Sequence, residues 1–208
     1  MPKTLSSDDI QQFRETMRRV AENAFATRGA QGVTMRELAK ELGCSAMTPY
    51  RYFRDKEEIL AMVRAAAFNR FAARLEAAAK RAPATDHSVV SEAYVAFALD
   101  EPHAYRLMFD LTQQEGAYPE LTAASQRAWR MLGSHFEQLV AAGILEGDPQ
   151  LIGYAYWASL HGFTMLALAN QLPLPQTQQS AASNAPTREA VFAQIRRMLW
   201  RGALPQHG

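Results

Sequence analysis

The sequence predicts an all-α protein, and two observations carry this prediction. Apolar residues recur at intervals of three and four along most of the 208-residue chain, the period of a helix that buries one face. Most of these stretches begin at a residue that caps helix N-termini, and several end at glycine. No segment of useful length alternates apolar and polar residues, as a half-buried strand would.

The first helix is expected from about Ser6 or Ser7, either of which can cap it, and Asp8 and Asp9 suit the positive end of a helix dipole. Its apolar positions share a spacing of three or four residues: Ile10, Phe13, Met17, Val20, Ala21, Ala24 and Phe25. Gly29 and Gly32 then end it.

Two short helices are expected next. Thr34 and Glu37 have the spacing of a capping box, and Val33 can pack on Leu38, so a helix begins at Thr34 and ends at Gly43. A third helix is expected over residues 46–53. Because proline is tolerated in a first turn and costly further in, this helix should begin close to Pro49 and be short.

A long fourth helix is expected from Lys56, capped by Asp55, to about Arg81. Two short helices joined by a glycine-bearing turn and flanked by longer ones form a helix-turn-helix arrangement. The sequence therefore predicts a helix-turn-helix domain over residues 1–55, with the helix 56–81 as a connection.

A second helical domain is expected over residues 82–208. Its predicted helices share the same periodicity and occupy residues 89–99, 102–111, 119–142, 149–172 and 187–201. Residues 172–187 are rich in Pro, Gln, Ser and Ala without a period, which is typical of a mobile loop.

Charge separates the two parts. The chain has a net charge of +1, but residues 1–81 contain 15 Lys and Arg against 10 Asp and Glu, and the remainder contains 7 against 11. This overall balance excludes a uniformly basic protein of the histone or ribosomal kind. An asymmetry of this size could arise by chance, yet it is also typical of two parts with different partners.

A single cysteine, Cys44, excludes an internal disulfide framework and a multi-cysteine metal site, and no metal or cofactor is expected. The N-terminus has no apolar stretch of the kind that secretory signals carry. A reducing, cytoplasmic location is the expectation.

The segment 34–56, TMRELAKELGCSAMTPYRYFRDK, resembles the DNA-binding helix-turn-helix of the TetR family of bacterial transcriptional regulators. The matching positions are Thr34, Leu38-Ala39, Leu42-Gly43-Cys44-Ser45, Thr48, Tyr50, Tyr52-Phe53 and Lys56. Two positions depart from the family pattern: Cys44 stands where valine is usual, and Pro49 where leucine is common. The resemblance implies a DNA-binding regulator.

Residue chemistry agrees with that role. Small or flexible side chains at a helix start can approach base edges in the major groove, where Met47 suits a thymine methyl and Arg36 suits guanine. Thr34, Thr48, Tyr52 and Lys56 are expected on phosphates. The predicted DNA-contacting residues are Thr34, Arg36, Ser45, Ala46, Met47, Thr48, Tyr50, Arg51, Tyr52 and Lys56. Arg51 and Arg54 could equally be solvated charges, Phe53 is expected in the core, and Cys44 is expected to be an inert buried thiol.

Residues 102–109 and 157–162 resemble the C-terminal ligand-binding domain named after its Trp-His-Gly motif, which occurs on one branch of TetR-like regulators. No Asp, Glu, Lys or Arg occurs between residues 149 and 187. A membrane span is disfavoured because His161, Asn170 and Gln171 are polar and basic flanks are missing. The helix 149–172 is therefore expected to be buried all round. The resemblance implies that one side of this helix lies against a second copy of the chain.

Two faces of that helix follow from helical spacing, and the sequence leaves open which one lines a pocket and which one forms a dimer seam. The pocket candidates are Tyr105, Phe109, Trp129, Tyr154, Trp157, His161 and Met165. The dimer candidates are Tyr156, Leu160, Phe163, Ala167, Val191, Ile195 and Leu199. Such a lining suits an uncharged aromatic or acyl-like ligand.

The predicted function is that of a homodimeric repressor that binds double-stranded DNA at a palindromic operator and is released by a small effector. An enzyme is not expected, because the five histidines are scattered and no HExxH, GxSxG or phosphate-binding glycine loop occurs. Two alternatives stay open: an architectural DNA-binding protein without effector, and a small-molecule-binding or enzymatic helical bundle.

Overall fold

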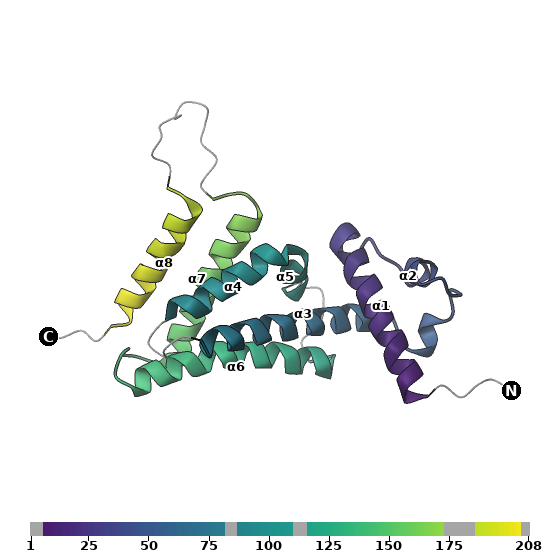
Figure 1. The fold of residues 1–208 in the computed structure, drawn as a ribbon, viewed down its shortest axis with the longest axis horizontal. Coiled ribbons are helices and arrows are strands. Elements are labelled where there is room, and N and C mark those ends of the chain that lie inside the picture. The colour runs from purple at the N-terminus through teal and green to yellow at the C-terminus, as the bar shows by residue number, and fades with distance from the viewer. Residues whose placement is uncertain (1–5, 82–86, 110–115, 173–185, 205–208) are drawn as a thin grey trace, which may run out of the picture. The chain divides into compact units, whose positions relative to one another are not determined.

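A computed structural model describes residues 6–81, 87–109, 116–172 and 186–204, and within these ranges every regular element is helical (Figure 1). The elements are α1 (Ser7–Arg28), α2 (Met35–Glu41), the 3₁₀ helix η1 (Pro49–Arg51), α3 (Lys56–Ala79), α4 (His87–Asp100), α5 (Pro102–Met108), α6 (Pro119–Ala141), α7 (Pro149–Leu168) and α8 (Arg188–Gly202). The predicted all-α class is confirmed.

The chain divides into two compact units. One contains Met1–Arg70 and His103–Gln126, and the other contains Phe71–Pro102 and Arg127–Gly208. Compactness alone does not say which segment binds which partner. The functional division expected at residues 55 and 82 therefore stays a prediction.

The predicted helix starts in the first unit are confirmed. Ser6 caps α1: its hydroxyl accepts the Asp9 N–H at 3.1 Å, and the Asp9 carboxylate accepts the Ser6 N–H at 3.2 Å. Thr34 and Glu37 form the expected capping box at the start of α2. The Asp55 carboxylate accepts the Glu58 N–H at 2.8 Å, which places the start of α3 at Lys56.

The helix expected over residues 46–53 is wrong in type and extent. Residues 46–48 form a turn, and Pro49–Arg51 is a single 3₁₀ turn. The Thr48 N–H donates to the Ser45 carbonyl at 2.9 Å and the Arg51 N–H donates to the Thr48 carbonyl at 3.1 Å. Pro49 has no N–H to continue an α-helical ladder, so the tighter spacing of three residues takes over. The expected start at Pro49 and the short length are confirmed.

In the second unit, α7 packs against both α4 and α8 (Figure 1). The Asp148 side chain caps α7 and accepts the N–H groups of Gln150 and Leu151. α7 ends at Leu168, four residues before the expected end. Asn170 adopts a left-handed φ of 55°, and the Gln171 N–H donates to the Leu166 carbonyl at 2.8 Å, a common helix stop.

Two further expectations concern segments between helices. α5 ends at Met108 rather than 111, because the Phe109 N–H bonds the Arg106 carbonyl at 3.3 Å in a turn. The loop expected over residues 172–187 lies mostly outside the described residues. None of the helices in the described part of the chain combines the length and hydropathy that a membrane crossing requires.

Candidate nucleic-acid interface

A buried apolar core holds the first helices together and determines which of their side chains face outward. Phe53 lies two residues after the 3₁₀ turn and is 2% exposed, which confirms its predicted place in the core. It belongs to a cluster that also contains Met17, Ala21, Phe25, Val33, Leu38, Ile59, Leu60 and Val63. Because α1, α2 and α3 all contribute to this cluster, one hydrophobic core positions the turn between residues 45 and 52 relative to all three helices.

The turn between α1 and α2 is closed by a residue from α3. Gly32 is required there, since a Cβ would lie 2.3 Å from the Arg28 carbonyl oxygen. The Lys56 ammonium donates to the Ala30 carbonyl at 2.8 Å. Lys56, which the sequence predicts on a phosphate, thus also holds the α1–α2 turn against the start of α3.

At the start of α2 the hydroxyl of Thr34 is already engaged. It accepts the Glu37 N–H at 3.3 Å and donates to the Glu37 carboxylate at 2.7 Å. Hydrogen bonds from the Thr34 side chain and main chain lower the pKa of Glu37, so a phosphate approaching Thr34 meets an ionised carboxylate. Arg36 is exposed and has no hydrogen bond or ion pair to any residue that the structure describes.

The turn after α2 follows from one glycine. Gly43 has a φ of +72°, a conformation that side chains rarely adopt, and the Cys44 N–H donates to the Ala39 carbonyl at 3.0 Å. The Ser45 and Thr48 hydroxyls lie 2.9 Å apart and hydrogen-bond to each other at the start of the next turn. Cys44 is half-buried, so the expected full burial of this thiol is wrong.

The 3₁₀ turn presents two large side chains to solvent. Met47 is 70% exposed and Tyr50 is 50% exposed, while Pro49 between them is buried. Ser45, Ala46 and Arg51 are also exposed. A hydrophobic side chain that is this exposed contributes little to the core, so packing does not explain the presence of Met47 or Tyr50.

Tyr52 follows the 3₁₀ turn and packs against α1. Its ring stacks on Phe13 with a centroid distance of 4.0 Å and an interplanar angle of 17°. Its main-chain carbonyl accepts from Arg14 Nη1 at 2.8 Å, and the same guanidinium lies 4.5 Å above the Phe53 ring. Arg14 thus ties α1 to the residues directly after the 3₁₀ turn.

Arg14 and its partner Glu58 are not among the residues predicted from the sequence. Glu58 accepts from Arg14 Nη1 at 3.1 Å and from the Arg54 N–H at 2.9 Å. Burial raises the pKa of Glu58, but these hydrogen bonds outweigh it and the net pKa lies below the usual value. One signal was available: Arg14 stands three residues before Met17, in register with the apolar stripe of α1.

In the second unit the structure brings together four of the pocket candidates. The Trp129 ring lies 4.4 Å from Trp157 and 5.2 Å from Tyr154, and Trp157 lies 5.7 Å from His161. Burial lowers the pKa of His161, which favours the neutral imidazole. We call Trp129, Tyr154, Trp157 and His161 the aromatic cluster.

The other pocket candidates lie elsewhere. Tyr105 is fully buried in the first unit, where its ring contacts Phe109 at 5.0 Å. Met165 is 39% exposed on α7. A cavity of about 10 Å³ lies against Phe136, Tyr156 and Leu160, room for one water at most. Among the described residues, no three His, Cys, Asp or Glu side chains form a group that could hold a metal ion.

The dimer candidates of α7 face the interior of the second unit. Tyr156, Leu160, Phe163 and Ala167 are all buried within this chain. Phe163, for example, stacks on Phe192 of α8 at 5.1 Å. The exposed apolar side chains of α7 and α8 are instead Leu151, Tyr154, Met165, Leu166 and Met198. The dimer candidates of α8, namely Val191, Ile195 and Leu199, are half-buried.

Comparisons with known proteins agree with this geometry. A family model described as bacterial regulatory proteins, tetR family, matches residues 18–63, which include the whole 34–56 segment. A second family model, whose description is "Tetracyclin repressor-like, C-terminal domain", matches residues 88–186. These residues include the Trp-His-Gly segment 157–162. Together they cover well over half of the chain.

Solved structures resemble the chain over nearly its full length. A protein of unknown function from Rhodococcus sp. RHA1 is 27% identical, with a TM-score of 0.77 and coverage of 99% of this chain and 100% of that one. A TetR-family transcriptional regulator from Pectobacterium atrosepticum is 21% identical, with a TM-score of 0.69 and coverage of 98% and 100%. The TetR family transcriptional regulator PfmR from Thermus thermophilus is 20% identical, with a TM-score of 0.64 and coverage of 91% and 99%. A comparison with curated proteins found no match.

The fold and the exposed turn define a helix-turn-helix protein that binds DNA. The chain belongs to the TetR family of bacterial regulatory proteins, and it is a DNA-binding transcriptional regulator.

Proposed function

We propose that the chain acts as a homodimeric repressor that leaves a palindromic operator when a small apolar or aromatic molecule binds its C-terminal half. The observation that carries the DNA-contacting part is the exposure of Met47 and Tyr50 on a turn anchored by buried Pro49 and Phe53. A turn that is anchored in the core and exposes two large side chains to solvent is suited to reading base edges.

Eight of the ten predicted contacts can be given a specific role. Met47 packs on a thymine methyl group, Tyr50 contacts the groove with its ring and hydroxyl, and Arg36 bonds guanine O6 and N7. Phosphates are bound by four residues, which also orient the turn: Thr48, Arg51, Tyr52 and Lys56. Thr34 contributes less than the others, because its hydroxyl is already engaged with Glu37.

Anisotropy titrations with the DNA that flanks the gene test this proposal. The full-length protein should bind one flanking palindrome well above random DNA, and Tyr50→Ala should weaken specific binding about tenfold. Leu99→Ala is the matched control, since Leu99 is a 41% exposed apolar residue on α4. Equal affinity for all sequences would instead favour the architectural DNA-binding protein, whose affinity would also fall steeply with salt.

The dimer is proposed on the apolar surface that α7 and α8 expose. Leu151, Met165, Leu166 and Met198 are each 39–68% exposed, and α7 itself contains no charged residue. Apolar side chains gathered like this on two neighbouring helices mark an interaction site. A palindromic operator requires a two-fold partner, so the occupant is a second copy of the chain.

The effector is proposed at the aromatic cluster. Trp129, Trp157 and His161 are half-buried, and the lowered pKa of His161 leaves that imidazole uncharged, so the lining suits an uncharged ring. Release from DNA requires that the effector and the operator weaken each other equally. Tryptophan fluorescence titrations with aromatic compounds, with and without operator, measure that coupling. Compounds that bind the cluster and leave operator affinity unchanged would contradict this proposal.

A further inference from the structure

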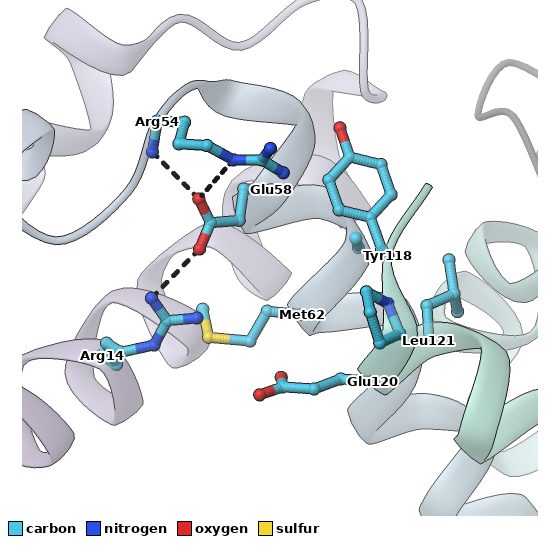
Figure 2. Close-up of a pocket in the computed structure, with 9 residues that line it drawn as sticks. Arg14, Arg54, Glu58, Met62, Tyr118, Glu120 and Leu121 are labelled. Carbon is cyan, nitrogen blue, oxygen red and sulfur yellow. Dashed lines mark hydrogen bonds and ion pairs between the residues drawn. The ribbon is translucent and has the colours of Figure 1, made fainter. Parts of the chain in front are cut away.

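A cleft of about 340 Å³ opens in the first unit beside the start of α3 and the start of α6 (Figure 2). Its size lies within the range of small-molecule sites. The lining side chains come from α1, from the turn and first helical residues of α3, and from the start of α6: Arg14, Arg54, Glu58, Ala61, Met62, Tyr118, Pro119, Glu120 and Leu121.

The carboxylate of Glu58, one of the charged groups that line the cleft, is already hydrogen-bonded to other residues of the chain. The Glu58 carboxylate accepts from Arg14 Nη1 at 3.1 Å, from the Arg54 N–H at 2.9 Å and from Arg54 Nε at 3.4 Å (Figure 2). Its lowered pKa keeps it ionised. Glu58 and Arg14 therefore form a neutral, hydrogen-bonded ion pair in the lining of the cleft, and neither charge is available to a ligand.

Two opposite charges remain available to a ligand. The Arg54 side chain is 70% exposed, and its two terminal nitrogens have no partner among the described residues. Glu120 is exposed and likewise makes no hydrogen bond or ion pair within the described ranges. In Figure 2 the side chains of Arg54 and Glu120 lie on opposite sides of Met62.

The remaining lining of the cleft is apolar and aromatic. Ala61 is buried, and Met62 and Leu121 are half-buried. The Tyr118 ring lies 5.7 Å from the Arg54 guanidinium. Burial, followed by the nearby carboxylates of Asp55 and Glu57, raises the pKa of Tyr118, so its phenol stays protonated and can donate.

We propose that this cleft binds a small zwitterion with an apolar body, such as an apolar dipeptide, with its carboxylate on Arg54 and its ammonium on Glu120. The lining contains two arginines and two glutamates, so its charges cancel. A simple anion would pair with Arg54 but leave Glu120 without a partner, and a simple cation would do the reverse. The site is independent of the effector proposed at the aromatic cluster, and it lies in the first unit, which also contains the exposed turn with Met47 and Tyr50.

Calorimetric titration of the full-length protein with leucyl-phenylalanine and a panel of other apolar dipeptides tests the proposal. Each dipeptide is compared with its N-acetylated form, which lacks the ammonium, and its C-terminal amide, which lacks the carboxylate. We expect each blocked form to bind at least about tenfold more weakly. Arg54→Gln and Glu120→Gln should each weaken the parent dipeptide by a similar factor. Arg54→Gln keeps the main-chain bond to Glu58, so the local fold is preserved.

Arg130→Gln and Glu137→Gln are the matched controls, because both residues are exposed on α6 and neither lines the cleft. Circular dichroism confirms that each variant is folded. Three results would overturn the proposal: no saturable heat with any dipeptide up to about 10 mM, equal binding of the blocked forms, or unchanged binding in both cleft variants.

Discussion

The ammonium of Lys56, the first residue of α3, donates a hydrogen bond of 2.8 Å to the main-chain carbonyl of Ala30 in the turn between α1 and α2. This bond joins segments 26 residues apart and is partly buried. Lys56 is therefore both a cation near the proposed DNA surface and a structural link between three helices. The structural role can be tested by the free energy of unfolding, and the proposed DNA role by the affinity for DNA.

Replacing Lys56 with Met should lower the free energy of unfolding by about 1–2 kcal/mol, because the Ala30 carbonyl loses a charged donor. Urea unfolding followed by circular dichroism measures this. Lys40→Met is the control, since Lys40 is an exposed lysine of α2, and a change below about 0.5 kcal/mol is expected. Equal stability of Lys56→Met and the parent protein would show that Lys56 acts on DNA alone.

Tyr52 also combines two roles, and its hydroxyl and ring can be separated. Tyr52→Phe keeps the stack on Phe13, so stability should change by less than about 0.5 kcal/mol, whereas operator affinity should fall if the hydroxyl binds phosphate. Tyr52→Ala should lose about 2 kcal/mol of stability as well, because the stacked, half-buried ring is removed. Parallel anisotropy and unfolding measurements distinguish these outcomes. If Tyr52→Phe binds DNA as tightly as the parent protein, the Tyr52 hydroxyl does not bind phosphate and the residue contributes only through packing.

Helix starts could be predicted from the sequence because their signals are local. Ser6, Thr34, Asp55, Asp148 and Thr187 each cap a helix within three residues of their own position, so neighbouring residues suffice to recognise them. The exposed turn with Met47 and Tyr50 was predictable for the same reason. Its 3₁₀ form was not, because proline is compatible with several tight turns.

Features that depend on distant residues could not be predicted. Glu58 lies 44 residues from Arg14, and nothing in either neighbourhood indicates their pairing. α7 is apolar on every side, so no period distinguishes the face that packs against α4 and α8 from the face that stays exposed. For this reason the sequence alone could not decide which face of α7 lies inward.

The Arg14–Glu58–Arg54 network predicts acid sensitivity. The pKa of Glu58 is lowered from 4.5 in the folded chain, so its contribution to stability is fully present above about pH 4.5 and is lost as the pH falls through the lowered value. Glu58→Gln should be less stable than the parent protein by about 1 kcal/mol at pH 7, and the difference should shrink below pH 4.5. Urea unfolding from about pH 3 to 7 measures this. A difference that is constant with pH would contradict the role of the Glu58 charge.

The exposure of α7 predicts which of its residues would hold two copies of the chain together in the proposed dimer. Leu166 is 47% exposed, whereas Phe163, three residues earlier, is 3% exposed and stacked on Phe192. Leu166→Glu should leave the fold intact and convert a dimer to a monomer in sedimentation velocity, because a charge is placed in an apolar interface. Phe163→Ala should cost about 3–5 kcal/mol of stability through the cavity it leaves, yet the chains that stay folded should still associate. Leu99→Glu, at another exposed leucine on α4, should change neither property. A parent protein that sediments as a monomer, or a Leu166→Glu variant that remains dimeric, would show that this surface is not the interface.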